Sequence, residues 1–138
     1  MEKAIKKAVD NQGNIKDSAS SKLRNIRKNI RTTSDRIQDK LNSIINSNRY
    51  QNHIQESVVT IRDERYVIPI KSEYKSKFPG IVHDQSASGQ TVFIEPMPIV
   101  KMNNQLRELK SQEEQEIYRI LKELTIKVKV NLEEIKYT

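Results

Sequence analysis

The sequence predicts an α+β protein in which long antiparallel helical arms, packed as a coiled coil, carry a small antiparallel β-sheet between them. Apolar residues recur at steps of three and four towards both ends of the chain, which indicates amphipathic helices. β-Branched runs and turn formers concentrate in the middle, which indicates short strands. The apolar fraction is only 35% and the charged fraction is 31%. Since a compact globule has about 45–50% apolar residues, this balance favours helices that bury a single stripe.

The first helical arm is predicted over residues 1–56, with a break near 11–16 where Gly and Asn cluster. Helical spacing already begins at Ala4. After the break, the main helix is expected from 20 to 46, with Asp17, Ser18 or Ser20 as its N-cap. Its stripe is expected to comprise Leu23, Ile26, Ile30, Thr33, Ile37, Leu41, Ile44 and Ile45.

The sheet is predicted within residues 57–96. One strand pair is expected at 58–61 and 66–70 around the charged turn 62–65, and a second pair at 80–84 and 91–95. Pro69 has no N–H to donate, so it is expected at a sheet edge or a bulge.

The second helical arm is predicted over residues 97–138, because Pro98 is tolerated in a first helical turn. Glu113 interrupts its apolar stripe, which is expected to pack antiparallel against the helix at 20–46. Because helical patterns reach both ends of the sequence, the chain is expected to be a segment of a longer protein. The stripe comprises Ile99, Met102, Leu106, Leu109, Ile117, Ile120, Leu124, Val128, Leu132 and Ile135.

Composition excludes several kinds of site. The sequence has no Cys, so disulfides, thiol nucleophiles and thiolate metal sites are impossible. It has two histidines, His53 and His83, without the helical spacing of a zinc site. No apolar run approaches the ~20 residues of a membrane span. We therefore expect a soluble, cytoplasmic protein without a membrane partner, a bound metal or a small-molecule substrate.

The net charge of +7 is concentrated in the first arm. Residues 1–50 hold 12 Lys and Arg against 5 Asp and Glu, which accounts for the whole net charge. A face that neutralises phosphates would bind nucleic acid in a salt-sensitive way. The alternative is a solvated helix face or a surface that docks on another domain. The candidate residues are Arg24, Arg27, Lys28 and Arg31.

A second basic group lies within the predicted sheet region. Lys71, Lys75 and Lys77 alternate with the aromatic residues Tyr74 and Phe78. Aromatic rings beside cations can stack on exposed bases, but these two rings can equally form a small core.

The densest polar stretch, residues 83–91, contains a His, an Asp and a Ser. A hydrolytic triad is disfavoured, since His83 and Asp84 would face opposite sides of a strand and no nucleophile elbow is present. The remaining readings are an ordinary turn and a polar fingertip that contacts phosphates or another surface. The fingertip candidates are His83, Gln85, Ser86, Ser88 and Gln90.

Several motifs together resemble a known family. They are VVTIR at 58–62, RYVIPIK at 65–71, GIVHDQSASG at 80–89, TVFIEP at 91–96, and Asn103 with Asn104. These motifs resemble the second bacterial branch of the MutS family, the mismatch-repair-like paralogue that lacks the mismatch-reading N-terminal domains. DSAS at 17–20 fits the same family upstream.

The resemblance implies the lever and clamp region of such a protein, with the clamp at about 58–95. In MutS relatives, lever helices connect an ATPase to clamps that encircle nucleic acid. This branch is associated with branched-DNA binding, suppression of recombination and rescue of collided ribosomes. The parent is expected to be a homodimeric ATPase that uses ATP and Mg and carries an endonuclease domain.

The chain itself is expected to be non-catalytic and to hold no cofactor, because no phosphate-binding motif G-x-x-x-x-G-K-[ST] is present. Its expected partner is nucleic acid, either branched DNA or ribosomal RNA. The alternative is a purely structural or dimerising coiled-coil arm that makes no partner contact of its own.

Overall fold

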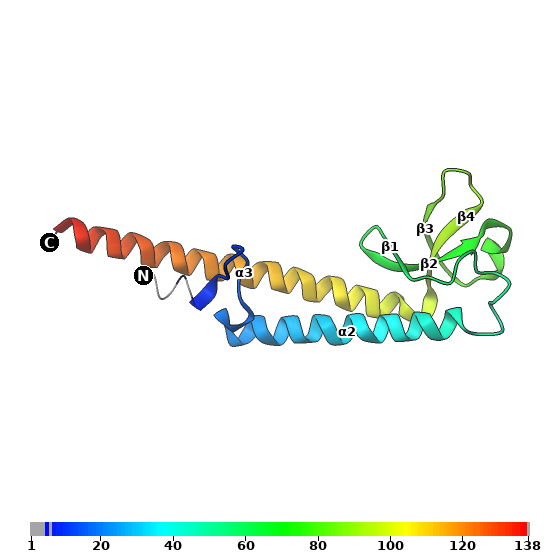
Figure 1. Cartoon of the computed structure of the whole chain (residues 1–138), viewed down its shortest axis with the longest axis horizontal. Coiled ribbons are helices and arrows are strands. Elements are labelled where there is room, and N and C mark those ends of the chain that lie inside the picture. Colours follow the sequence, from blue (N-terminus) through cyan, green and yellow to red (C-terminus); the bar gives the residue numbers. More distant parts are fainter. Residues whose placement is uncertain (1–4, 6, 138) are drawn as a thin grey trace. The chain divides into compact units, whose positions relative to one another are not determined.

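The computed structural model describes Ile5 and residues 7–137 (Figure 1). The predictions for Ala4 and for the side chain of Ile135 lie outside what it describes. The chain forms two compact units, each built from segments that are distant in sequence. The first unit combines Met1–Arg31 with Arg107–Thr138, and the second is Thr32–Leu106. The predicted boundaries at 1–56, 57–96 and 97–138 remain predictions.

Two helices supply segments to both units. Helix α2 spans Ser21–Ile45 and helix α3 spans Met97–Tyr137, in agreement with the periodicity of the sequence. Ser20 is the N-cap of α2, because its hydroxyl oxygen accepts a hydrogen bond of 2.9 Å from the backbone N–H of Leu23. Pro98 lies in the first turn of α3, where its missing N–H costs no helical hydrogen bond.

The first unit has a small apolar core. Ala8, Ile15, Leu23 and Ile120 are buried together, with Ile117 and Leu124 among the partly buried residues packed around them. The N-terminal segment reaches this core by reversing at Gly13, whose φ of +83° lies in the region that glycine adopts readily. A short 3₁₀ turn, η1 (Asp17–Ala19), then leads into α2.

The predicted burial of Leu132 is wrong, since this side chain is 56% exposed. Among the side chains that the structure describes, the core cluster of the first unit reaches along α3 as far as Leu124.

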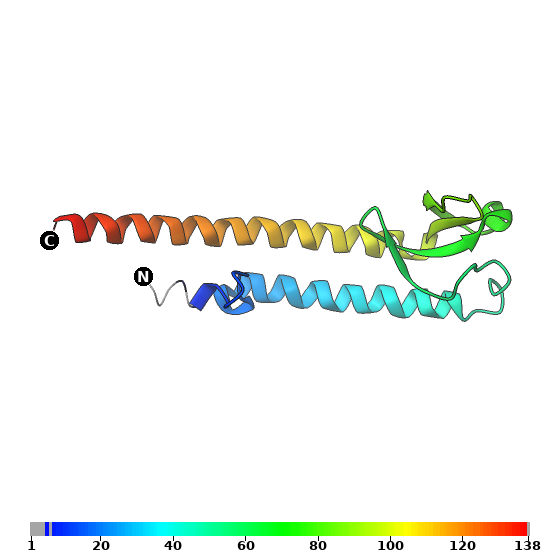
Figure 2. The same ribbon diagram turned by 45° about the horizontal axis from the view of Figure 1, so that its top comes forward.

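The second unit contains a single four-stranded antiparallel sheet in the order β1-β2-β4-β3 (green in Figure 2). Its strands are β1 (Thr60–Arg62), β2 (Arg65–Lys71), β3 (Gly80–Gln85) and β4 (Thr91–Pro96). The two predicted strand pairs are present, and they join because Ile68 of β2 pairs with Ile94 of β4. We call this sheet, together with the 3₁₀ segment η2 (Ser72–Lys77), the head.

The turn between β1 and β2 is the predicted charged turn. Asp63 and Glu64 both have positive φ, 51° and 62°. Two such residues between paired strands match the tight hairpin turn whose twist suits a right-twisted sheet, a geometry that normally selects Asn and Gly.

The expectation that Pro69 lies at a sheet edge or a bulge is wrong, because β2 lies between β1 and β4 and the register shift of the sheet is in β3. Strand β1 pairs with β2 only as far as Val67, opposite Thr60. The carbonyl of Pro69 accepts a hydrogen bond of 3.0 Å from the N–H of Gln55. N–H and C=O of one residue point to the same side of a strand, so the missing N–H faces a side where the β1 ladder has ended.

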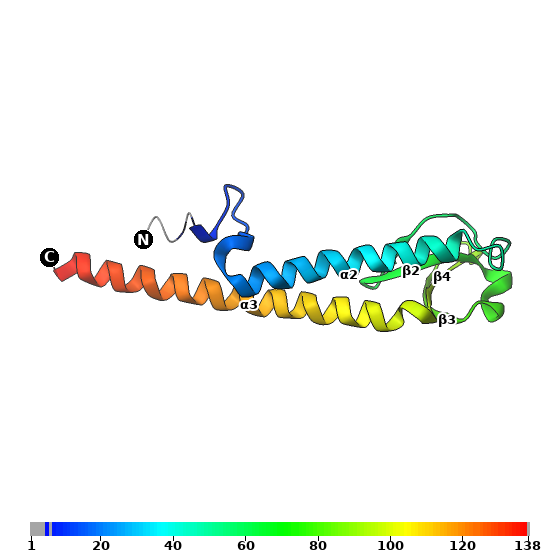
Figure 3. The same cartoon turned by 90° about the horizontal axis from the view of Figure 1, so that it is seen from below.

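The buried side chains of the second unit lie on both its sheet and its helical segments. Within this unit the part of α2 after Arg31 lies alongside the start of α3, as Figures 1 and 3 both show. Thr33 fills the apolar stripe of α2 as predicted and is 6% exposed. The sequence prediction of an α+β fold with a small antiparallel sheet is confirmed. The fully buried side chains include Ile37, Leu41, Val67, Ile68, Ile70, Ile94 and Ile99.

Candidate functional site

The hairpin loop, residues 86–90 between β3 and β4, is closed by its own hydrogen bonds. The N–H of Ser86 donates to the carbonyl of Thr91 at 2.9 Å, and the N–H of Thr91 donates back to Oγ of Ser86 at 3.1 Å. Oγ of Ser86 also lies 3.3 Å from Oγ of Ser88. Gly89 takes the positive φ, 75°, that the loop requires. The side chain of Ser86 therefore shapes the loop, while Gln85, Ser88 and Gln90 are exposed.

A bulge in β3 places His83. Val82 pairs with Ile94, but the next pair is Asp84 with Phe93, so the ladder shifts by one residue. His83 reaches Glu95, and Asp84 pairs with Arg62, whose guanidinium lies over the ring of Phe93. Phe93 and Glu95 are two residues apart on β4 and share a face. The prediction that His83 and Asp84 face opposite sides is therefore wrong, because a bulge breaks the alternation.

Glu95 is the centre of a buried polar cluster, the carboxylate network, formed with Arg65, His83 and Asn103. Oε1 of Glu95 lies 2.6 Å from Nε2 of His83. Oε2 accepts hydrogen bonds from Nε of Arg65 at 3.1 Å, from Nη2 of Arg65, and from Nδ2 of Asn103 at 2.8 Å. Asn103 also donates to the carbonyl of Tyr66 at 3.2 Å. The network thus links β2, β3 and β4 to the first turns of α3.

Electrostatics keep Glu95 ionised although it is fully buried. Burial by itself acts to raise the pKa of this carboxyl, since a low-dielectric interior disfavours charge. Hydrogen bonds from Arg65, His83 and Asn103, with the positive charge of Arg65, outweigh burial and hold the pKa of Glu95 below its ordinary value. Sequence reasoning missed this residue, because an acid just before Pro96 resembles an ordinary helix-start signal.

The geometry around His83 does not match a hydrolytic triad among the described residues. His83 binds Glu95, whereas the hydroxyl of Ser86 is engaged with Ser88 and Thr91 in its own loop. A triad requires the histidine to hydrogen-bond the nucleophile. Within the same described part of the chain, His, Asp and Glu nowhere gather in threes that could hold a metal ion.

The head brings two groups of predicted contact residues to one place. Lys71 and Gln90 line a hollow of about 510 Å³, together with Gln55, Ser72, Glu73 and Gly89. Hydrogen bonds fasten the two sides of the hollow. The hydroxyl of Ser72 donates to the carbonyl of Gly89 at 2.5 Å, and its N–H donates to the carbonyl of Gln90 at 3.0 Å. Lys75 and Lys77 follow on η2 and are exposed.

In the first unit, one residue of the basic face is held internally. Arg27 donates to Oδ1 of Asp17 and the carbonyl of Ile15, both at 2.6 Å, and to Oε2 of Glu113 at 3.0 Å. These contacts explain why Glu113 interrupts the apolar stripe of α3. The hydrogen bond from Arg27 lowers the pKa of Asp17. Exposed neighbours of Arg27 on the same helix are Arg24, Lys28 and Arg31, of which Arg31 also lies 3.7 Å from Asp17.

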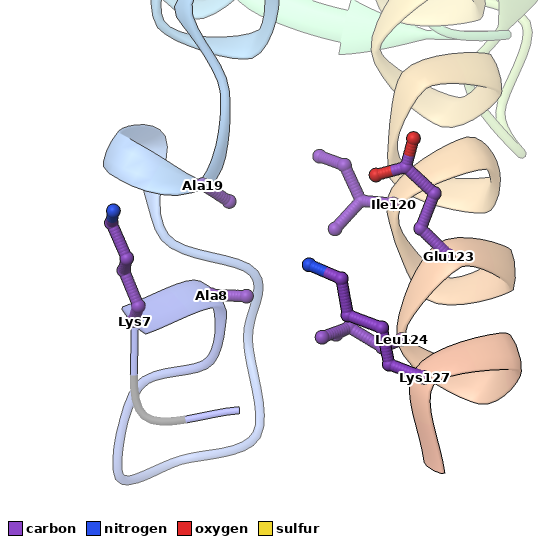
Figure 4. A pocket seen from close by; sticks show the side chains of 7 residues that line it. All are labelled: Lys7, Ala8, Ala19, Ile120, Glu123, Leu124 and Lys127. Atoms are coloured by element: carbon purple, nitrogen blue, oxygen red, sulfur yellow. The ribbon is translucent and has the colours of Figure 1, made fainter. Parts of the chain in front are cut away.

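The first unit also contains a small cavity of about 200 Å³ (Figure 4). Ala8, Ala19, Ile120 and Leu124 form its apolar lining, and Lys7, Glu123 and Lys127 surround it with charge. In Figure 4 the alanine side chains point towards the residues of α3. No helix in the described part of the chain has the length and apolar character of a membrane span.

The sequence is similar to proteins that share one name. The chain is 59% identical over 94% of its length to "Endonuclease MutS2" of Halothermothrix orenii. It is 49% identical over 99% of its length to "Endonuclease MutS2" of Geobacillus thermodenitrificans, and 53% over 96% to that of Brevibacillus brevis. The chain spans only 16–17% of the length of these curated relatives. No protein-family model matches it. The resemblance to the second bacterial MutS branch is confirmed.

Proposed function

We propose that this chain, whose sequence matches one segment of the much longer MutS2 proteins, is a non-catalytic lever and clamp that grips nucleic acid with its head. One observation supports this function above the others. The hairpin loop and η2, which are separate in sequence, meet around a single hollow that Lys71 and Gln90 line. Lys75 and Lys77 extend the positive charge beyond it. Lysine ammonium groups bind phosphates without reading sequence, as a clamp requires.

A clamp also needs a firm base, which the carboxylate network supplies in this proposal. His83 ties β3 to Glu95 of β4, and Asn103 ties Glu95 to α3. Buried hydrogen bonds would therefore couple the position of the hairpin loop to that of α3. Buried networks whose members are all satisfied make a structure rigid. In this function α2 and α3 serve as the coiled-coil lever.

The partner of this lever and clamp is branched DNA or structured ribosomal RNA. We place the catalytic steps in the remaining five-sixths of the longer polypeptide. Those parts would hold ATP and Mg, form the homodimer and carry the endonuclease activity that gives the relatives their name. Suppression of recombination and rescue of stalled ribosomes are the processes that such a clamp would serve.

A second candidate function is a structural or dimerising arm. It is favoured by exposed apolar residues on α3, where Leu121 is 45%, Ile126 is 54% and Val130 is 48% exposed. Uncovered apolar surface of this kind marks interaction sites. If the chain serves only as a dimerising arm, it should self-associate as its concentration rises and should not bind nucleic acid. Sedimentation velocity measures the self-association.

Fluorescence anisotropy with labelled branched DNA, duplex DNA and a structured ribosomal RNA fragment tests the clamp. Binding should weaken as salt rises, with log K falling by about 0.9 per phosphate neutralised for each unit of log salt. The head variant replaces Lys71, Lys75 and Lys77 with Glu. If each lysine neutralises one phosphate, the slope becomes shallower by about 3.

Two further variants separate the head from general charge and from the arm. The matched control reverses the exposed lysines Lys101, Lys110 and Lys122, which changes net charge equally. The arm variant reverses Arg24, Lys28 and Arg31 and retains Arg27, because its loss would break internal ion pairs. Equal losses in the head and control variants would contradict a localised clamp. Absence of binding at low salt would assign the chain to the structural role.

A further inference from the structure

We propose that an aromatic cluster in the second unit, formed by Tyr50, His53, Tyr74 and Phe78, is a stacking site for unpaired bases. This inference rests on the proposed function and names its substrate class. The preferred partner is a strand with unstacked nucleotides, such as a single-stranded region, a junction or a loop, rather than continuous duplex.

The cluster is assembled from two segments. Tyr50 and His53 follow α2, whereas Tyr74 lies in η2 and Phe78 directly after it. The first segment is fastened to β2 beside η2, because the N–H of Lys71 donates to the carbonyl of His53 at 2.8 Å. An isolated bridge between Ile54 and Ile70 continues this pairing.

The rings contact one another at an angle. The centroids of His53 and Tyr74 are 4.4 Å apart with an interplanar angle of 69°, and those of Tyr50 and Phe78 are 4.8 Å apart at 60°. Tyr50 and His53 are 5.7 Å apart. Tilted and edge-on contacts of this kind stabilise the cluster without stacking its rings face to face.

Burial divides the cluster into a foundation and an outer part. Phe78 is only 4% exposed and belongs to the core, whereas Tyr50 and Tyr74 are half-buried. Each tyrosine carries a cation over its ring. Arg49 lies 5.3 Å from the ring centroid of Tyr50, and Nζ of Lys77 lies 5.9 Å from that of Tyr74. Arg49 and Lys77 are exposed and both tyrosines are half-buried, so neither ring nor the cation over it is enclosed in the core.

A tyrosine ring with an exposed cation above it matches the two chemical parts of a nucleotide. The flat base can stack on the ring while the phosphate binds the displaced cation, and the aromatic cluster offers this pair twice. Base–aromatic stacking depends little on the identity of the base, so it suits a surface that binds nucleic acid without recognising its sequence. In a duplex both faces of each base are already stacked, so only unpaired bases can reach these rings.

The test uses three labelled oligonucleotides of equal length in the anisotropy assay: a thymine single strand, an abasic single strand and a fully paired duplex. Tyr50→Leu and Tyr74→Leu should each weaken binding of the thymine strand by about 5- to 150-fold, the loss of one stacked base. Neither should change binding of the abasic strand or the duplex by more than 2-fold. The matched variants Tyr50→Phe and Tyr74→Phe retain a ring face and should bind as the unaltered chain does.

Tyrosine emission gives a second readout that needs no substitution, because the chain has five Tyr and no Trp. Stacking should quench this emission with the thymine strand but not with the abasic strand. The stacking site is wrong if the thymine and abasic strands quench equally, or if the Leu variants bind like the unaltered chain while the lysine-reversed head variant loses affinity. That second pattern keeps the clamp. Failure of every oligonucleotide to bind at low salt would overturn the clamp and the stacking site together.

Discussion

Replacing Glu95 with Gln tests whether the carboxylate network stabilises the head. The change keeps the shape of the side chain and one acceptor oxygen, but removes the charge that Arg65 and His83 face. Glu95 is fully buried and the side chain of Arg65 is only 9% exposed, so water cannot replace the lost partner. Breaking a buried ion pair from one side costs about 3–5 kcal/mol. Because Gln retains one hydrogen-bond acceptor, we expect a loss of about 2–4 kcal/mol.

Amide hydrogen exchange is the appropriate assay, because it assigns a free energy of opening to each part of the chain. The protected amides of β2 and β4 should exchange faster, because the free energy of opening falls by about 2–4 kcal/mol. The exchange rates of amides around Leu23 in the first unit should not change. The control is Glu56→Gln, an exposed acid in the same unit. A loss within about 0.5 kcal/mol of the control would refute a stabilising role for the network.

The same variant has a pH signature. The pKa of Glu95 is lowered in the folded chain, so its contribution is fully present above the ordinary carboxyl pKa of 4.5 and is lost as pH falls through the lower folded value. Protection of the head should therefore decline on acidification below about pH 4.5 in the unaltered chain. In Glu95→Gln the decline should be smaller. A double-mutant cycle with Arg65→Leu should give a coupling energy of about 1–3 kcal/mol.

Three further predictions concern local geometry. Glu64→Gly should raise the stability of the second unit by about 1 kcal/mol, because a φ of 62° is energetically unfavourable for a residue with a Cβ but not for glycine. Chemical denaturation measures this change in stability, and Glu56→Gly is the control at an exposed site. Gly80→Ala should destabilise the same unit by about 1–3 kcal/mol, since an added Cβ would lie 2.4 Å from the backbone oxygen of Glu95. This destabilisation should appear as faster hydrogen exchange of the β4 amides, and an unchanged exchange rate would contradict the steric clash. In the first unit, hydrogen bonds from Arg119 and Ser20 lower the pKa of Glu116 from 4.5 to about 2. The stability that ionised Glu116 contributes should therefore be lost as pH falls from 4.5 to about 2. In an acid titration followed by circular dichroism, Glu116→Gln should lose less helical signal over this range than the unaltered chain does.

Elements whose signals are local could be predicted from the sequence. The stripes of α2 and α3 follow from side chains three and four residues apart. Ser20 marks the start of α2 through a short-range hydrogen bond, and Pro98 marks the start of α3 because the first turn does not need its N–H. The strands were also predictable, since β-branched runs bounded by turn formers rarely fit other structures. Thr33 in a stripe of apolar residues required only the spacing.

The pairing of β2 with β4 and the carboxylate network could not be predicted in the same way. Glu95 depends on Arg65, His83 and Asn103, which lie 30, 12 and 8 residues away, so no window of the sequence contains them as a pattern. The bulge at His83 brings this side chain to Glu95, a contact that regular alternation along β3 does not predict. Glu113 likewise interrupts the apolar stripe of α3 for a reason that the sequence alone does not show, namely its hydrogen bond with Arg27.

The bulge in β3 has a consequence for how this protein can vary between species. Deleting one residue from 81–84 would restore a regular ladder but move His83 away from Glu95, leaving a buried acceptor with one partner fewer. Adding a residue there would enlarge the bulge and would also move His83 away from Glu95. The hairpin loop at 86–90 has no such constraint on its tip, where Ala87 and Ser88 are exposed. Natural length changes in this hairpin should therefore occur in the loop and be absent from β3.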